Sequence, residues 1–316
     1  MSKVLVTGIA GFIGSSIARA LLHEGAQVCG IDNLCTGNME NLAEILDRIE
    51  FIQGDINDPD TVARACRGAQ YVFHQAAIPS VPKSVKDPVG SNLANIDGTL
   101  SVLVAARDAK VKRVIYAASS SAYGDQPTLP KREDMPPAPI SPYAVQKLAG
   151  EYYMGSFWKV YGLETVSLRY FNIFGPRQDP TSPYSGVLAK FTTQMLQGET
   201  PTIFGDGETS RDFTYIDNAV QANLKAAKAN SSVAGGMFNV ATGVRVTLNQ
   251  AFEALRKVTG YSGGVNYAPE REGDVKHSLA DISAAAAALG YSPTVSFEDG
   301  LGHTVAWYRE AGVGAR

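Results

Sequence analysis

The chain has 316 residues, of which 45% are hydrophobic and 19% charged, and its formal net charge is −3. This length suits about two domains with a large core, and so small a net charge implies no basic face for nucleic acid. The sequence has no run of about eighteen apolar residues, so no membrane span is predicted. Glycines interrupt the apolar stretch near its start, which argues against a signal peptide. We therefore expect a cytoplasmic protein with neither a nucleic-acid nor a membrane partner.

The three cysteines are odd in number and lack the spacing of metal ligands. Cys29 falls within a predicted strand, so a reduced structural thiol is favoured over a disulfide. The sequence thus predicts no metal site.

Short β-branched runs alternate with helical stretches through the first half of the chain. Strands are predicted at residues 4–6, 27–31, 51–53, 71–74, 113–117 and 165–169. Helices are predicted at residues 12–23, 61–67, 92–109 and 142–160. This alternation predicts βαβ units, and the expected fold class is α/β, a Rossmann-type doubly wound parallel sheet.

The pattern changes after residue 169, where prolines become frequent. A helix is expected at 187–197, a further buried strand at 237–240, and helix and loop from 247 onward, including a helix at 282–289 that ends at Gly290. We expect a smaller, discontinuous α/β substrate-binding domain from residues 170–212 and 243–316. The dinucleotide domain would then comprise residues 1–169 and 213–242.

A glycine-rich segment, Thr-Gly-Ile-Ala-Gly-Phe-Ile-Gly, lies between the first strand and the first helix. Its Gly-x-x-Gly-x-x-Gly spacing is a variant of the Rossmann fingerprint, in which each missing Cβ permits a tight turn or a close approach to pyrophosphate. The helix that follows offers unsatisfied N–H donors to phosphate. The predicted cofactor contacts in this segment are Gly8, Gly11, Phe12, Ile13 and Gly14.

Acidic residues follow the second and third strands. Asp32 and its neighbour Asn33 come about twenty residues after the glycine loop, where a carboxylate accepts from ribose hydroxyls and repels a 2′-phosphate, so NAD is favoured over NADP. The alternative role of Asp32 is to cap the next turn. Asp55 and Ile56 are predicted to contact adenine, although Asp55 would serve equally well as a helix N-cap.

The fourth strand ends in His74 and is followed by Gln75, Ala76 and Ala77. The small residues let the backbone approach the cofactor, and all three are predicted cofactor contacts. His74 has no sequence partner for metal binding or acid–base chemistry, so core packing is predicted for it.

A reactive pair is predicted at the start of the helix at 142–160. Ser141 can cap this helix, Pro142 suits its first position, and Tyr143 and Lys147 then share one helix face. The helix dipole, the ammonium and an oxidised nicotinamide should depress the pKa of Tyr143 from about 10 toward working pH, making it a general base. Ser119 ends a strand at the edge where a parallel sheet opens its ligand crevice.

Four motifs together resemble a known family. They are the glycine segment, Ser119-Ser-Ser-Ala-Tyr-Gly124, Tyr143-x-x-x-Lys147 and Arg169-Tyr-Phe-Asn172. The chain is similar to the extended short-chain dehydrogenases/reductases, and within them to nucleotide-sugar 4-epimerases. The resemblance implies that Ser119, Tyr143 and Lys147 are catalytic, that NAD is the cofactor, and that Tyr170 contacts it.

The resemblance also implies a set of substrate contacts. Asn172, Arg211 and Arg271 would bind the diphosphate, and Asp274 the uridine ribose; bidentate arginine suits phosphate oxygens, although most arginines are only solvated surface residues. Ser121 is a second candidate for contact with the sugar. The remaining expected contacts are Ser80, Val187 and Ser278.

The activity implied by the resemblance is C4 epimerisation of a UDP-hexose through a transient 4-keto sugar. Ser278 stands where the family gates room for the 2-substituent, and its small side chain favours UDP-N-acetylglucosamine and UDP-N-acetylgalactosamine over UDP-glucose and UDP-galactose. Segments 178–180 and 80–84 favour the same pair. The helices at 92–109 and 142–160 resemble those that form a four-helix homodimer interface.

Three alternatives to this activity remain. A 4,6-dehydratase needs an Asp-Glu pair after the active serine and a nucleotide-sugar decarboxylase needs a glutamate there, whereas this chain has Ser120 and Ser121. A noncatalytic dinucleotide sensor would keep the glycine loop without needing Ser119, Tyr143 and Lys147 together.

Overall fold

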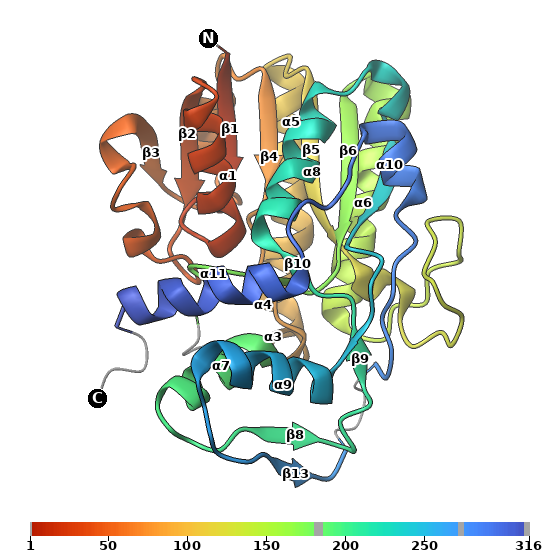
Figure 1. Ribbon diagram of the computed structural model, residues 1–316. Coiled ribbons are helices and arrows are strands. Elements are labelled where there is room, and N and C mark those ends of the chain that lie inside the picture. The colour runs from red at the N-terminus through yellow and green to blue at the C-terminus, as the bar shows by residue number, and fades with distance from the viewer. Residues whose placement is uncertain (1, 180–185, 271–274, 313–316) are drawn as a thin grey trace.

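A seven-stranded sheet forms the centre of the computed structural model, which describes residues 2–179, 186–270 and 275–312 (Figure 1). Its strands are β1 (Lys3–Thr7), β2 (Gln27–Asp32), β3 (Ile49–Gln53), β4 (Tyr71–His74), β5 (Arg113–Ser119), β6 (Glu164–Tyr170) and β11 (Gly236–Val240). All pairings are parallel, and the order is β11-β6-β5-β4-β1-β2-β3. The predicted Rossmann-type α/β fold is confirmed.

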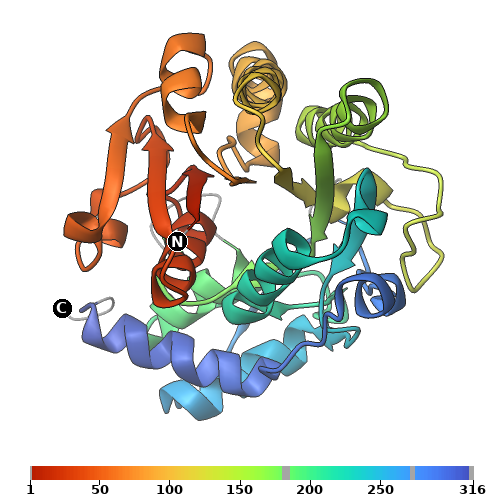
Figure 2. The same cartoon turned by 90° about the horizontal axis from the view of Figure 1, so that it is seen from above.

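Helices cover both faces of the sheet (Figure 2). One face carries α1 (Phe12–His23) and α8 (Ile216–Lys228), and the other carries α2 (Pro59–Cys66), α5 (Gly98–Asp108) and α6 (Pro142–Tyr161). Because both faces are covered, the central strands are almost continuously buried, which explains the apolar runs of β1 and β5. In β6, by contrast, the polar residues Thr165, Ser167 and Arg169 are buried as well.

The strand order reverses direction at β1, which has β2 on one side and β4 on the other. In an open parallel sheet, ligands bind outside the carboxyl ends of the strands at such a switch point. Thr7 and His74 end these two neighbouring strands and are register partners. The cofactor crevice is therefore expected between the ends of β1 and β4.

The remaining elements lie mostly beyond the carboxyl edge of the sheet (Figure 1). They are α7 (Val187–Leu196), α9 (Leu248–Thr259), α11 (Phe297–Glu310), and the pairs β7 (Ile173–Phe174) with β10 (Thr214–Tyr215), β8 (Thr202–Phe204) with β13 (Asn266–Ala268), and β9 (Ser210–Arg211) with β12 (Val246–Thr247). By contrast, α10 (Ser283–Leu289) packs on β11 and α8. The division into two discontinuous domains stays a prediction.

Several predicted elements need correction. The expected helix at 92–109 consists of α4 (Pro88–Asn92), a π-helical turn (Leu93–Asp97) and α5, and it starts early because Asp87 caps the Gly90 N–H. The part after residue 247 is not only helix and loop, since β13 pairs with β8. The helices α3 (Val81–Lys86) and α8 were not among the predicted elements.

A buried ion pair ties the far end of the sheet to α8. The Arg113 guanidinium donates to Glu164 Oε2 from both Nε and Nη2, at 2.9 and 2.6 Å, and to the carbonyls of Ala226 and Ala229. A cation at this position satisfies the last carbonyls of the helix and complements its dipole. This pair lies at the amino ends of the strands, opposite the crevice. None of the described helices is long and apolar enough to cross a membrane.

Candidate active site

The glycine loop is packed too tightly to accept side chains. Gly8 has φ +68°, and a Cβ on it would lie 2.7 Å from the Ala76 nitrogen. A Cβ on Gly14 would lie 2.1 Å from the Gly8 carbonyl oxygen. Gly11 precedes α1 and offers no side-chain cap, so the first N–H groups of this helix remain available to phosphate. The loop therefore fits the pyrophosphate of a dinucleotide.

Asp32 is fixed at the end of β2 by two backbone donors. Its Oδ2 accepts from the Ala10 N–H at 2.9 Å, and its Oδ1 accepts from the Leu34 N–H at 2.8 Å. Burial raises the pKa of Asp32, whereas these hydrogen bonds lower it. The carboxylate thus caps the next turn, as the alternative role required, and the same geometry places it beside the glycine loop. Ribose binding by Asp32 stays a prediction.

Asn33 and Asp55 are brought together, as expected for one cofactor-facing edge. Asn33 Nδ2 donates to Asp55 Oδ2 at 2.8 Å, and the Asn57 N–H donates to Asp55 Oδ1 at 2.8 Å. The N-cap role considered for Asp55 is wrong, because Asp58 caps α2. Ile56 is buried in the core beneath α2 and α5.

Gln75 and Tyr170, both predicted cofactor contacts, meet through a residue that the sequence did not single out. Asn223 Nδ2 donates to the Tyr170 hydroxyl at 2.7 Å, and that hydroxyl donates to Gln75 Oε1 at 3.3 Å. Gln75 Nε2 in turn donates to Asn223 Oδ1 at 3.3 Å. Burial raises the pKa of Tyr170 to about 12, so it stays protonated. Asn223 lies on α8, which was not predicted.

His74 is buried, as predicted, but it also closes a hydrogen-bond chain. Thr99 donates to the Asn95 carbonyl at 2.7 Å, so it accepts from His74 Nε2 at 3.0 Å. The other ring nitrogen must then accept from the Thr7 hydroxyl at 2.8 Å, which in turn accepts from the Ala76 N–H. Burial lowers the pKa of His74 to about 3, so the ring is neutral with its proton on Nε2. The ends of β1 and β4 are thereby tied to the π-helical turn.

The start of α6 agrees with the sequence prediction. Ser141 Oγ caps the helix by accepting from the Ala144 N–H at 3.2 Å, and Pro142 occupies the first turn. The Tyr143 N–H donates to Ser84 Oγ at 3.0 Å, which fixes the first turn against α3. Tyr143 and Lys147 therefore lie on the first two turns of this helix.

A hydrogen bond joins Tyr143 to Ser119, and Ser121 Oγ donates to Ser119 Oγ at 2.9 Å. The expected depression of the Tyr143 pKa by the protein's own groups is wrong: burial raises it, and the Ser119 hydrogen bond offsets this only in part. Burial lowers the pKa of Lys147 to about 7, with Glu151 acting in the opposite direction. The ammonium form of Lys147 is therefore only weakly favoured near neutral pH. This explains why its charge does not determine the pKa of Tyr143.

Two further residues anchor α6 and were missed from the sequence. Asn95 Nδ2 donates to Gln146 Oε1 at 2.8 Å, and Gln146 Nε2 donates to Ser91 Oγ at 2.9 Å. Asn95 Oδ1 also accepts from the Ile78 N–H at 2.7 Å, in the loop after β4. Asn95 lies in the π-helical turn, a feature that often marks functional sites. Gln146 precedes Lys147, and its near-complete burial was not evident from its polar character.

The predicted substrate residues lie on several segments. Asn172 Nδ2 donates to the Asp212 carbonyl at 3.2 Å, so Asn172 lies beside the strand of Arg211. The Ser278 N–H donates to the Ser210 carbonyl at 3.0 Å, which places Ser278 next to the same strand. Val187 begins α7, and Ser80 is the buried N-cap of α3. Arg271 and Asp274 lie outside the described residues.

Asp212, which sequence reasoning did not single out, holds these segments together. Its carboxylate accepts from the Thr242 N–H and hydroxyl, the Gly243 N–H and the Ala280 N–H, at 2.7–3.2 Å. Burial raises the pKa of Asp212, while these four donors lower it. The segments that contain Arg211 and Ser278 are thereby fixed to the end of β11.

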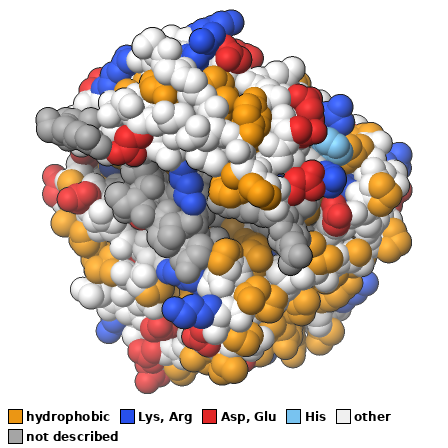
Figure 3. Space-filling view, turned by 90° about the horizontal axis from the view of Figure 1, so that it is seen from below, with side chains coloured by type: hydrophobic (Ala, Val, Ile, Leu, Met, Phe, Trp, Pro, Cys, Tyr) orange, Lys and Arg blue, Asp and Glu red, His pale blue; other side chains and the backbone are white. Residues whose placement is uncertain are grey.

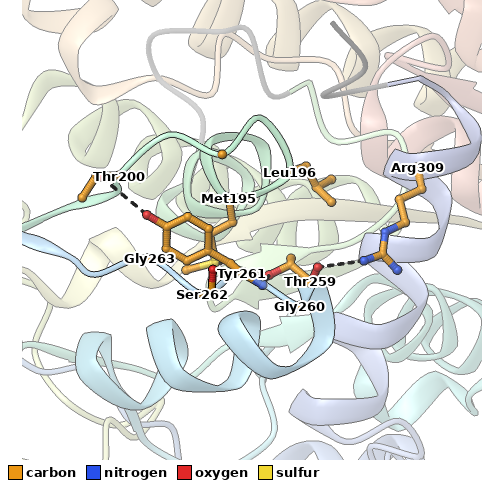
Figure 4. Close-up of a pocket in the computed structure, with 10 residues that line it drawn as sticks. Met195, Leu196, Thr200, Thr259, Gly260, Tyr261, Ser262, Gly263 and Arg309 are labelled. Atoms are coloured by element: carbon orange, nitrogen blue, oxygen red, sulfur yellow. Dashed lines mark hydrogen bonds between the residues drawn. The ribbon is translucent and has the colours of Figure 1, made fainter.

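A separate cavity of about 760 Å³ lies between the carboxyl ends of α7, α9 and α11 (Figure 4). Its one charged lining residue is Arg309, whose Nη2 donates to the Thr259 carbonyl at 2.9 Å. The cavity contains none of the predicted site residues and no acid–base pair, so the chemistry is assigned to the crevice. Among the described residues, no group of three His, Cys, Asp or Glu side chains is arranged to hold a metal.

The fold, the glycine cradle and the Ser-Tyr-Lys set define an NAD-dependent enzyme of the dinucleotide-binding α/β class. Residues 4–241 match the NAD dependent epimerase/dehydratase family, and the chain belongs to this family. NAD is its cofactor.

Three similar proteins cover nearly the whole chain. A UDP-glucose 4-epimerase of Mycolicibacterium smegmatis is 39% identical, with 97% of this chain and 98% of that protein covered. Among solved structures, a UDP-N-acetylglucosamine 4-epimerase from Methanobrevibacter ruminantium, in complex with UDP-N-acetylmuramic acid, is 43% identical, with a TM-score of 0.94 over 98% of this chain and 99% of that one. A UDP-glucose 4-epimerase from Thermotoga maritima, with UDP-glucose, is 40% identical, with a TM-score of 0.93 over the same shares.

Replacing Gly14 with Ala should weaken NAD binding by roughly tenfold or more, equivalent to about 1.4 kcal/mol, because the new Cβ forces the Gly8 carbonyl out of place. NAD affinity would be measured by calorimetry on protein stripped of nucleotide. Gly302→Ala is the control, since a Cβ there meets nothing within 4 Å. Equal affinities in both variants would contradict the tight-loop account.

Proposed function

We propose that the protein interconverts the C4 epimers of a UDP-hexose, with NAD held through each turnover. The observation that carries this proposal is the hydrogen bond between Tyr143 and Ser119, which ends β5 at the carboxyl edge of the sheet, with Lys147 one turn further along α6. Epimerisation at an alcohol carbon needs one group to move a proton and one to move a hydride. The chain's own residues supply the first of these, and the chemistry that NAD supplies when bound is reversible hydride acceptance.

Tyr143 is the group we assign to the proton on the sugar O4. Ser119 is hydrogen-bonded to Tyr143 and so lies where it can share that proton, while Ser121 bonds Ser119 from the other side. Lys147, one turn further along α6, stabilises the phenolate and orients the cofactor ribose. The 4-keto sugar turns within the site, and Tyr143 returns the proton to the opposite epimer. Arg211 and Asn172 would hold the diphosphate, so the nucleotide stays fixed while the hexose turns.

For the substrate we propose UDP-N-acetylglucosamine and UDP-N-acetylgalactosamine. Ser278 is small, and its backbone is fixed beside Ser210, in the strand that carries Arg211. A small residue at this place leaves room for an N-acetyl group on C2. The similarity to an epimerase named for UDP-N-acetylglucosamine supports this choice, whereas similar UDP-glucose epimerases favour the plain hexoses.

The dehydratase and decarboxylase alternatives are disfavoured because the carboxylic acids that those reactions require after the active serine are missing. Ser120 and Ser121 form a 3₁₀ turn directly after Ser119, at the place where those reactions need carboxylates. A noncatalytic sensor would have no use for a tyrosine fixed by a serine hydrogen bond at the crevice.

We also propose a homodimer formed through α6 and the helices beside it. Exposed apolar side chains gather on this side of the molecule, in the lower part of the view in Figure 3. Those from α3, α4, the π-helical turn, α6 and the loop before α6 are Val81, Val85, Val89, Leu93, Ile140, Val145, Tyr152, Val160 and Tyr161. An apolar patch of this kind on a soluble protein marks an interface, and a second copy would bury it symmetrically.

Tyr143→Phe should reduce turnover by at least about a hundredfold, because general acid–base catalysis contributes roughly 10²–10⁴-fold. NAD should remain bound, since the glycine loop is unchanged. The epimers of UDP-N-acetylglucosamine would be separated by NMR after incubation. Tyr161→Phe, at the exposed end of the same helix, is the control. Wild-type turnover in the Tyr143 variant would end the proposal.

Ser278→Tyr should lower kcat/KM for UDP-N-acetylglucosamine by about tenfold or more relative to UDP-glucose, because the larger side chain fills the space of the N-acetyl group. Ser283→Tyr, at the start of α10, is the control. The two substrates would be compared in parallel assays. Equal losses on both sugars would remove Ser278 as the gate.

Val145→Glu should convert the dimer to a monomer at micromolar concentration, because a charge on the patch would be buried without a partner. Val244→Glu is the control, because Val244 is exposed to a similar extent (59%, against 50% for Val145) and lies outside the patch. Sedimentation velocity would measure both. A wild-type protein that sediments as a monomer would refute the interface.

A further inference from the structure

Lys147 and Glu151 lie one helical turn apart on α6, a spacing at which lysine and glutamate commonly pair. Here Glu151 is bound elsewhere. Arg169 on β6 donates from Nε to Glu151 Oε1 at 2.9 Å and from Nη2 to Glu151 Oε2 at 2.7 Å. Among the described residues, Lys147 takes part in no ion pair. Both carboxylate oxygens are thus committed to the guanidinium.

The Arg169 guanidinium is itself held in place from its other side. Its Cζ lies 4.6 Å from the ring centroid of Tyr123, and the Tyr123 hydroxyl donates to Asn239 Oδ1 at 2.7 Å. Arg169 and Glu151 are both almost completely buried. Arg169 and Tyr123 each belong to one of the sequence motifs, and the proton chemistry assigns no role to either residue.

One contact favours the charged form of Lys147 against the effect of its burial. Its Nζ lies 4.5 Å from the ring centroid of Tyr116, a cation–π contact. Gly150 permits this packing, because a Cβ there would lie 2.2 Å from the Tyr116 hydroxyl. The titratable groups nearest to Lys147 are His74, Tyr116, Tyr143 and Glu151, with Arg169 and Tyr123 beyond Glu151. The helices and the π-helical turn packed against α6 also carry Lys83, Lys86, Asp97, Arg107 and Asp108.

We propose that Arg169 is a positioning residue for this reaction: by binding both oxygens of Glu151, it keeps the Lys147 ammonium unpaired and available to Tyr143. The role of Lys147 rests on the proposed function. Without Arg169, the nearest carboxylate would attract the ammonium away from the phenol oxygen. The buried ion pair then has a purpose that stability alone does not give it, since such pairs are often no more stabilising than apolar residues.

Burial lowers the pKa of Lys147 to about 7, and Glu151 raises it. Glu151→Gln keeps one acceptor for Arg169, the amide oxygen, but removes the negative charge, so the Lys147 titration should move down by about one pH unit. Arg169→Gln leaves the Glu151 charge uncompensated, so the titration should move up by about one unit. With both changes together, the titration should return to near the wild-type value.

The titration would be followed by NMR of ¹³C-lysine in the NAD-bound protein, with the Lys147 signal assigned from Lys147→Met. The alkaline limb of the epimerase pH profile should shift in the same directions, because the reaction needs charged Lys147. Glu164→Gln is the matched control: it alters the other buried arginine–glutamate pair, at the opposite end of the sheet, and should leave the titration unchanged.

Opposite shifts in the two single variants support the proposal. A Glu151→Gln titration that stays at the wild-type value, or shifts of the same sign in both variants, overturns it. Should Arg169→Gln not fold, Glu151→Gln and the double variant still decide. If the protein is an active epimerase but the Lys147 titration midpoint is the same in the variants as in the wild type, only the role of Arg169 is refuted. Shifted titrations in a protein that does not act on UDP-sugars would refute the proposed function instead.

Discussion

The attachment of α6 to the carboxyl ends of β4 and β5 is the constraint on which the rest of the site depends. Ser141 caps the helix, Ser84 holds its first turn, and Gln146 joins it to Asn95 in the π-helical turn. Each contact is a directed hydrogen bond, so the helix has little freedom to rotate or slide. As a result, Tyr143 meets Ser119 without relying on any bound ligand to bring them together.

Close packing and the hydrogen-bond chain through neutral His74 shape the carboxyl ends of β1 and β4, where the cofactor is expected. Gly8 approaches the backbone of Ala76 at a distance that no side chain would allow, so the ends of β1 and β4 form one surface. His74 holds these ends to the π-helical turn from beneath. The glycine loop and α6 thus share a common support, which fixes them relative to each other.

The sheet, the tight glycine loop and the capped start of α6 could be predicted from the sequence because each depends on a local pattern. Short β-branched runs predicted the seven strands. Ser141 and Pro142 predicted the start of the helix that carries Tyr143, because serine caps helices and proline suits their first position. Four residues that hold the site together by hydrogen bonds escaped prediction because their partners are distant in the chain, by up to 148 positions. These residues are Asn95, Gln146, Asp212 and Asn223. The protein's own groups were wrongly expected to lower the pKa of Tyr143, since sequence spacing reveals the neighbouring lysine but not the burial of both side chains.

The central claim is that hydrogen leaves C4 of the sugar as hydride while Tyr143 handles only the proton on O4. It is tested most directly with UDP-N-acetylglucosamine that carries deuterium at C4, incubated with the enzyme in ordinary water. The account predicts that the deuterium remains at C4 in the product epimer, as read by NMR and mass spectrometry. Replacement of that deuterium by solvent hydrogen during epimerisation would contradict it, because the carbon-bound hydrogen would then have left as a proton.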